Sequence, residues 1–125
     1  MISKYFLLLM VMLSAFVRAN AGEDWQLEHK KITGVYGVYG GGLGDPVAPT
    51  PKDTKIMFSV DGKMAKEIFD ATGPDVKDAC TEKSGIRVRK KDHENISCSR
   101  TAKGEYYCNF GFDLRTGKSI GGIVC

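Results

Sequence analysis

The chain has 125 residues, of which 42% are hydrophobic, 26% charged and 10% aromatic. This composition excludes a collagen-like, coiled-coil or wholly disordered chain, and the length allows at most one globular domain. The formal net charge of +3 is too small to indicate a surface that gathers polyanions, so we expect no nucleic acid partner.

The first 21 residues have the pattern of a secretory signal peptide. Lys4 supplies a positive charge, Tyr5 to Val17 form an apolar run, and Ala19-Asn20-Ala21 matches a signal peptidase site. The run is shorter than the roughly 20 residues of a spanning helix. We therefore predict a cleaved signal peptide over 1–21 and an exported mature domain over 22–125, periplasmic or secreted, with no transmembrane segment. Cleavage leaves 16 basic residues against 15 acidic ones.

All four cysteines lie in the predicted mature chain: Cys80, Cys98, Cys108 and Cys125. An even number of cysteines in a small exported domain indicates disulfides, here two. Zinc sites usually contain a pair of cysteines with two to four residues between them, and no such pair is present. We therefore predict two disulfides and neither a metal site nor a cofactor.

The segment from Gly34 to Pro46 holds six glycines, and further prolines follow it. We expect a strand start that runs into a Gly/Pro-rich loop over residues 34–52, with an ordered ligand cradle as the alternative. Long glycine-rich loops with aromatic residues carry function in some proteins. Tyr36 and Tyr39 are therefore candidate binding residues for a protein partner.

A short apolar strand and one helix follow this segment. Lys55 to Val60 has the character of a buried strand, and apolar residues recur at helical spacing from Lys63 to Thr72. Asp61 is placed to cap the helix and Gly73-Pro74 to end it. Asp75 to Cys80 is expected to add a helical turn, because proline followed by aspartate suits a helix start.

The densest charge cluster follows, where apolar Ile86 and Val88 alternate with basic residues as in a half-buried strand. The basic residues of this cluster are Arg87, Arg89, Lys90 and Lys91. They are candidate binding residues for an anionic envelope ligand or an acidic protein surface. A solvated edge strand explains the same residues, and nearby Asp92 and Glu94 favour this simpler interpretation.

The C-terminal third predicts a three-stranded antiparallel meander over Asn95–Thr101, Glu105–Leu114 and Lys118–Cys125. Glycine-containing connectors separate the strands. The expected registers place Cys98 opposite Cys108, and Cys108 opposite Cys125. Cys98 and Cys125 would then lie about 10 Å apart, beyond the roughly 7 Å Cα limit of a disulfide.

Two disulfide pairings remain after this exclusion. One joins Cys80 to Cys98 and Cys108 to Cys125, and the other joins Cys80 to Cys125 and Cys98 to Cys108. We favour the first pairing, because it ties the helical segment to the near strand and the chain end to the centre of the sheet.

Residues for catalysis are scarce. The two histidines, His29 and His93, lie in charged runs, and neither accompanies a recognisable nucleophile motif. We therefore predict no catalytic residue, and an enzyme is the less favoured class.

Together these patterns predict an α+β fold, in which an antiparallel sheet of about four to six strands carries one principal helix, ends in a three-stranded meander and holds two disulfides. The function we favour is an exported, non-catalytic binding or interaction protein, such as an inhibitor or sequestering factor of an envelope or extracellular target. The alternatives are a small hydrolase of envelope polymers, which requires convergent carboxylates or a histidine, and a structural envelope component.

Overall fold

The computed structural model describes residue 22 and residues 24–125, so the predicted signal peptide lies outside the described residues. The chain divides into two units, Met1–Lys30 and Lys31–Cys125. The described residues before Lys31 are exposed and contain no helix or strand. No described helix has the length and apolar character needed to cross a membrane.

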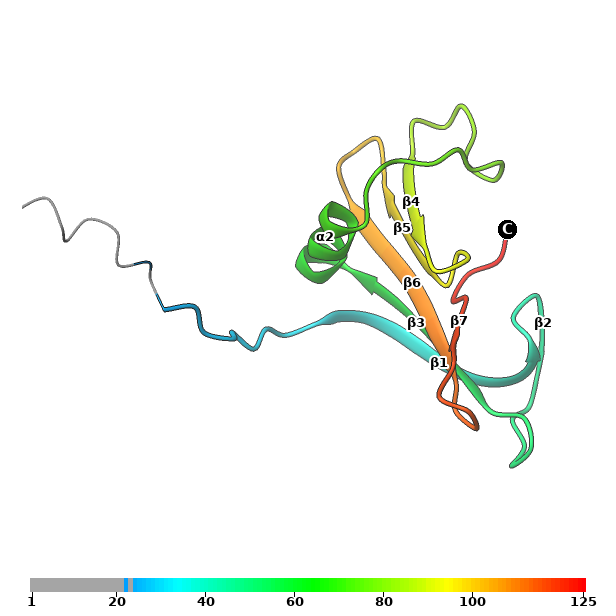
Figure 1. The fold of residues 1–125 in the computed structure, drawn as a ribbon. Coiled ribbons are helices and arrows are strands. Elements are labelled where there is room, and N and C mark those ends of the chain that lie inside the picture. The colour runs from blue at the N-terminus through cyan, green and yellow to red at the C-terminus, as the bar shows by residue number, and fades with distance from the viewer. Residues whose placement is uncertain (1–21, 23) are drawn as a thin grey trace, which may run out of the picture. The chain divides into compact units, whose positions relative to one another are not determined.

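The second unit is built on a seven-stranded antiparallel sheet that carries one helix (Figure 1). The strand order is β2-β1-β3-β6-β5-β4, and β7 pairs with β6. This arrangement confirms the predicted α+β fold, with more strands than the sequence indicated. In chain order the elements are β1 (Thr33–Gly42), β2 (Asp45–Val47), β3 (Lys55–Asp61), α2 (Gly62–Ala71), β4 (Arg87–Lys91), β5 (Ile96–Arg100), β6 (Tyr106–Asp113) and β7 (Ser119–Ile120).

Helix α2 packs across β3, β6 and β5 and buries the core between helix and sheet. Its apolar residues recur at helical spacing, so Ala65 and Phe69 both face the sheet and are buried. Asp61 occupies the N-cap position, but its carboxylate accepts a hydrogen bond from the Thr33 hydroxyl on β1 instead of capping the helix. The buried core consists of Val60, Ala65, Phe69, Cys98 and Cys108.

The prediction of a loop over residues 34–52 is wrong for its first half, where Thr33–Gly42 forms the longest strand of the sheet. Its residues Thr33–Tyr39 pair with Asp61–Lys55 of β3. The glycines allow close packing here: a Cβ on Gly34 would lie 2.3 Å from the Ser59 carbonyl oxygen. Glycine therefore permits the close approach of β1 and β3 in this pairing, whereas the glycine content of the sequence favours a loop.

The predicted meander is present, but its last strand is short. Cys98 lies opposite Cys108, as predicted, and the turn before β6 contains Gly104 at a positive φ of 84°. Strand β7 pairs Ile120 with Gly111 and ends there. Continued along the tail, this register would bring Ile123, not Cys125, opposite Cys108.

The favoured disulfide pairing is wrong, and the alternative is observed: Cys80 bonds to Cys125, and Cys98 to Cys108. The β5–β6 register sets Cys98 and Cys108 side by side beneath α2, where both are buried. Because the tail leaves the sheet after Ile120, Cys125 is not held opposite β6 and bonds instead to the loop after α2. The exclusion of a Cys98–Cys125 bond agrees with the observed pairing.

Candidate interaction site

An aromatic surface lies on the helix side of the sheet, and we call it the aromatic face. The strand registers align it in two rows across β1, β3 and β6. Its residues are Tyr36, Phe58 and Phe110 in the first row and Val38, Ile56 and Phe112 in the second. Exposure is 70% for Tyr36, 45% for Val38 and 38% for Phe112. An exposed apolar patch of this kind is typical of an interaction surface.

The phenylalanines of the aromatic face contact one another. The ring centroids of Phe58 and Phe110 lie 5.1 Å apart in a stacked arrangement. Phe112 packs edge-on against both rings, at 6.4 Å from Phe58 and 6.3 Å from Phe110. Aromatic pairs in these geometries gain about 1 kcal/mol beyond the burial of their surface. The three rings are therefore packed together in the structure in the absence of any partner.

The strand β1 beside this face has an open edge. It pairs with β3 on one side, but β2 covers its other side only at Gly40–Gly42. Thr33–Tyr39 therefore has no strand partner on that side within the described part of the chain. None of the residues from Thr33 to Gly42 is charged, although charged residues commonly protect such an edge from pairing.

The orientation of the free backbone groups follows from the end of β1. The Gly41 N–H donates to Asp53, and its carbonyl accepts from Lys55 of β3, so Gly41 faces the β3 side. Backbone groups alternate in direction along an antiparallel strand. The N–H and C=O groups of Gly34, Tyr36 and Val38 therefore point outward from the open edge.

The structure separates the two tyrosines that the sequence analysis singled out. Tyr36 belongs to the exposed aromatic face, whereas Tyr39 is only 7% exposed. They lie three residues apart on one strand, so their side chains leave opposite faces of the sheet. The structure does not bring them together, and only Tyr36 is accessible to a partner.

Two of the four basic residues on β4 are engaged on the helix side of the sheet. Arg87 and Arg89 each donate to the carboxylate of Asp75, with Nε–O distances of 2.7 and 2.8 Å. Arg89 also donates to the Phe69 carbonyl, and its guanidinium lies 4.2 Å from the Phe69 ring centroid. These hydrogen bonds hold the pKa of Asp75 at about 2 against an ordinary value of 3.8.

The predicted helical turn over Asp75–Cys80 is wrong, because the start of this segment is bonded to β4. The two arginines tie Asp75 to β4, and the Val76 N–H donates to the Val88 carbonyl. The backbone at Val76 therefore forms a β-bridge beside β4 instead of a helix.

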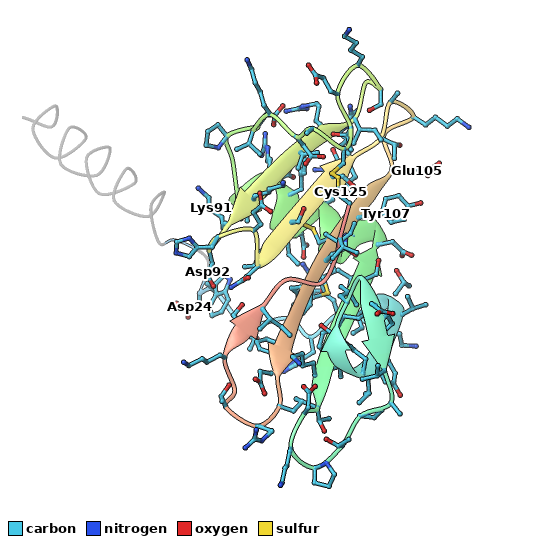
Figure 2. All side chains as sticks on the ribbon, turned by 90° about the vertical axis from the view of Figure 1, so that its right-hand side faces the viewer. Asp24, Lys91, Asp92, Glu105, Tyr107 and Cys125 are labelled. Carbon is cyan, nitrogen blue, oxygen red and sulfur yellow. A yellow bond between two sulfur atoms is a disulfide. The ribbon has the colours of Figure 1, made fainter. Side chains whose placement is uncertain are left out.

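The two lysines of β4 differ from each other. Lys90 lies on the side of the sheet away from α2, where it pairs with Asp78 at 3.0 Å and Glu94 at 3.1 Å. Lys91 is exposed at the end of the strand next to Asp92 (Figure 2) and has no ion pair among the described residues. Most of the cluster thus neutralises acidic groups of the same chain, which reduces its attraction for an external anion.

The hydrolase alternative requires convergent acidic groups, and Asp78 and Glu94 do converge on Lys90. A general acid needs a raised pKa, but the hydrogen bond from Lys90 lowers the pKa of Asp78. His93 lies in the turn after β4, outside this pair. Within the described ranges, no three His, Cys, Asp or Glu side chains form a group that could hold a metal ion.

Sequence reasoning missed the aromatic face, although part of its signal was visible. The alternation of aromatic residues along Tyr106–Phe112 predicts that they share one face, and they do. What could not be foreseen is that β1 pairs beside β3 and adds Tyr36 and Val38 to that face. Comparisons with protein families, curated proteins and solved structures find no match to this chain.

Proposed function

We propose that this chain is an exported, non-catalytic binding protein that recognises an extended apolar segment of a protein partner. One observation carries this proposal: the exposed aromatic face lies directly beside the open edge of β1. The partner segment would add to the sheet as a further strand along Thr33–Tyr39. This mode of recognition takes affinity from backbone hydrogen bonds and specificity from the side chains.

The geometry supplies both parts of such an interface. The outward N–H and C=O groups of Gly34, Tyr36 and Val38 offer up to six backbone hydrogen bonds to an added strand. Alternate side chains of that strand would lie over the helix side of the sheet, next to Tyr36 and Val38. Tyrosine is enriched among residues that dominate binding energy, so Tyr36 is the expected anchor.

Export is the part of the proposal that rests mainly on the sequence. The signal peptide pattern over 1–21 predicts it, and two disulfides are typical of chains that work in an oxidising compartment. The core cluster between helix and sheet holds five buried residues among those the structure describes, and a core of this size gains from such covalent links.

The experiment uses the oxidised mature chain as bait for envelope and culture-medium fractions. The double variant Tyr36→Lys/Val38→Lys places two charges beside the open edge and should lose the partner that the unchanged chain retains. Leu114→Lys is the control, because the exposure of Leu114 (53%) lies between those of Tyr36 and Val38 and the residue lies outside β1 and the aromatic face. Retention by the double variant would refute recognition through β1. Size-exclusion chromatography of the pure chain distinguishes a second copy as the occupant.

A further inference from the structure

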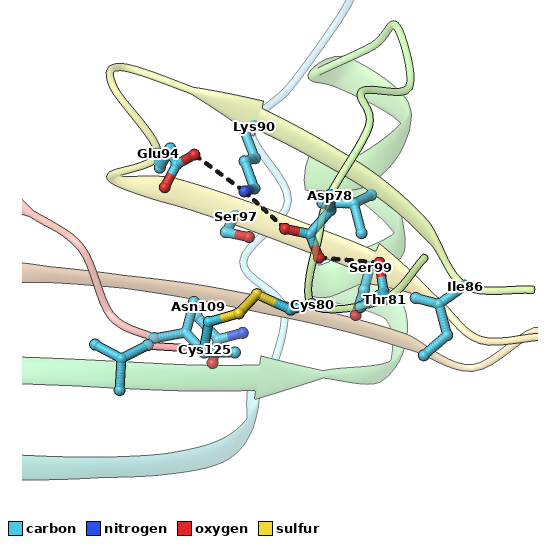
Figure 3. A pocket seen from close by; sticks show the side chains of 13 residues that line it. Asp78, Cys80, Thr81, Ile86, Lys90, Glu94, Ser97, Ser99, Asn109 and Cys125 are labelled. Carbon is cyan, nitrogen blue, oxygen red and sulfur yellow. Dashed lines mark hydrogen bonds and ion pairs between the residues drawn. A yellow bond between two sulfur atoms is a disulfide. The ribbon is translucent and has the colours of Figure 1, made fainter. Parts of the chain in front are cut away.

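A pocket of 190 Å³ lies on the side of the sheet away from α2, beneath the Cys80–Cys125 disulfide (Figure 3). Its floor comes from β4, β5 and β6, and its walls come from the loop after α2 and from the C-terminal tail. The disulfide joins these two walls. A single water needs only about 10–15 Å³, so the pocket has room for a small molecule.

The floor of this pocket contains polar side chains without partners. Asn109 is only 8% exposed, and its amide makes no hydrogen bond to any described residue. Ser97 and Ser99 line the same floor, and their hydroxyls are likewise free of hydrogen bonds within the described chain. No buried side-chain nitrogen or oxygen atom of the described chain lacks a partner, so these unpaired groups are open to solvent in the pocket. A ligand in the pocket can therefore reach them and form hydrogen bonds with them.

The charges in the pocket disfavour an anion. Lys90 is the basic residue in the described lining of the pocket, and its ammonium group already forms ion pairs with the carboxylates of Asp78 and Glu94. Two carboxylates against one ammonium leave the pocket with an excess of negative charge. A phosphate or carboxylate ligand would therefore be repelled, and no uncompensated cation of the lining would pair with it.

The remaining groups suit a molecule that carries hydroxyls on a small carbon frame. Serine hydroxyls and the asparagine amide both donate and accept hydrogen bonds, as ligand hydroxyls do. Ile86, Ile123 and Val124 supply apolar walls against which C–H groups can pack. We propose that this pocket is a binding site for a neutral hydroxyl-rich ligand of the size of a single sugar ring. The site is separate from the β1 edge.

The test uses three neutral hexoses, namely glucose, galactose and mannose, added to the oxidised mature chain and followed by NMR shifts of backbone amides. At least one hexose should give saturable shifts at Ser97, Ser99 and Asn109. The matching uronic acid, which differs by one carboxylate, should bind at least tenfold more weakly because of the negative charge in the pocket.

Variants locate the binding. Asn109→Leu keeps the side-chain volume and removes the amide, so hexose affinity should fall about tenfold or more, as expected for a lost buried hydrogen bond. Ser97→Ala should weaken binding in the same direction. Ser119→Ala is the control, because Ser119 is exposed on β7 outside the pocket, and its affinity should match that of the unchanged chain.

Several results would overturn this assignment. One is the lack of saturable shifts with all three hexoses at 100 mM, the top of the titration. Another is uronic acid binding as tight as hexose binding, which would identify an anion site. A third is unchanged hexose affinity in Asn109→Leu with retained fold, which would place the sugar elsewhere on the protein.

Discussion

Ser97 of β5 lies directly opposite Asn109 of β6, and both side chains line the pocket beneath the Cys80–Cys125 disulfide. The Asn109 amide makes no hydrogen bond to any described residue and is open to solvent, so its removal breaks no hydrogen bond within the described chain. Asn109→Leu should therefore leave the free energy of unfolding unchanged or raise it by about 1 kcal/mol. Urea denaturation of the oxidised chain measures this change. A loss of more than about 1 kcal/mol would show that the amide stabilises the fold.

The pairing of Asp75 with Arg87 and Arg89 predicts a specific acid dependence of stability. The folded-state pKa of Asp75 is about 2, below its ordinary value of 3.8. A lowered pKa stabilises the folded state above the unfolded-state value, and this contribution is lost as the pH falls through the folded-state value. Stability should therefore decline between about pH 4 and pH 2.

Asp75→Asn should remove this part of the pH profile, because the amide does not titrate. The double variant Arg87→Gln/Arg89→Gln should flatten the same pH range, since it removes both donors that lower the pKa. Urea midpoints collected from pH 5 to pH 2 would test both variants. An unchanged acid slope in Asp75→Asn would assign the acid sensitivity to other carboxylates.

The basic residues of β4 should differ sharply in their effect on stability. Arg89→Ala removes hydrogen bonds to Asp75 and Phe69 and a guanidinium stacked on the Phe69 ring, so we expect a loss of about 2 kcal/mol. Lys91→Ala should change stability by less than about 0.5 kcal/mol. Thermal unfolding of the two variants compares them directly. Equal losses of stability in the two variants would contradict the finding that Arg89 is held by hydrogen bonds whereas Lys91 has no ion pair among the described residues.

Sequence patterns predicted the elements whose signals are local. Helix α2 has a clear 3.6-residue period, and β5 and β6 are joined by a turn with glycine at the required position. The register that sets Cys98 opposite Cys108 follows from that turn. For these segments, local chemistry and tertiary pairing favour the same structure.

The incorrect predictions concern segments whose structure depends on distant partners. Gly34–Gly42 becomes a strand because β3 is available to pair with it, which its glycine content does not reveal. The tail bonds to Cys80 because β7 ends at Ile120, although the sequence could continue as a strand. The pocket and the aromatic face both depend on these long-range pairings, so sequence alone did not locate them.

The disulfide between Cys80 and Cys125 closes a loop between residues 45 apart. Loop entropy gives such a link about 4 kcal/mol, against about 3 kcal/mol for the 10-residue separation of Cys98 and Cys108. The double variant Cys80→Ala/Cys125→Ala should therefore lose about 4 kcal/mol of unfolding free energy. It remains folded only if the stability of the intact chain exceeds about 4 kcal/mol. Non-reducing peptide mapping should recover Cys125 linked to Cys80, and a Cys108–Cys125 peptide would contradict the pairing.

The two tyrosines of β1 should separate binding from folding. Tyr36 is 70% exposed, so Tyr36→Ala should lower the free energy of unfolding by less than about 0.5 kcal/mol while it weakens capture of the partner. Tyr39 is 7% exposed, and truncation of a buried aromatic side chain costs about 3 kcal/mol or more. Urea denaturation measures the stability of each of the two variants, and partner capture measures the binding of each. If Tyr36→Ala destabilised the chain as much as Tyr39→Ala does, Tyr36 would be a packing residue and the β1 edge would lose its proposed anchor.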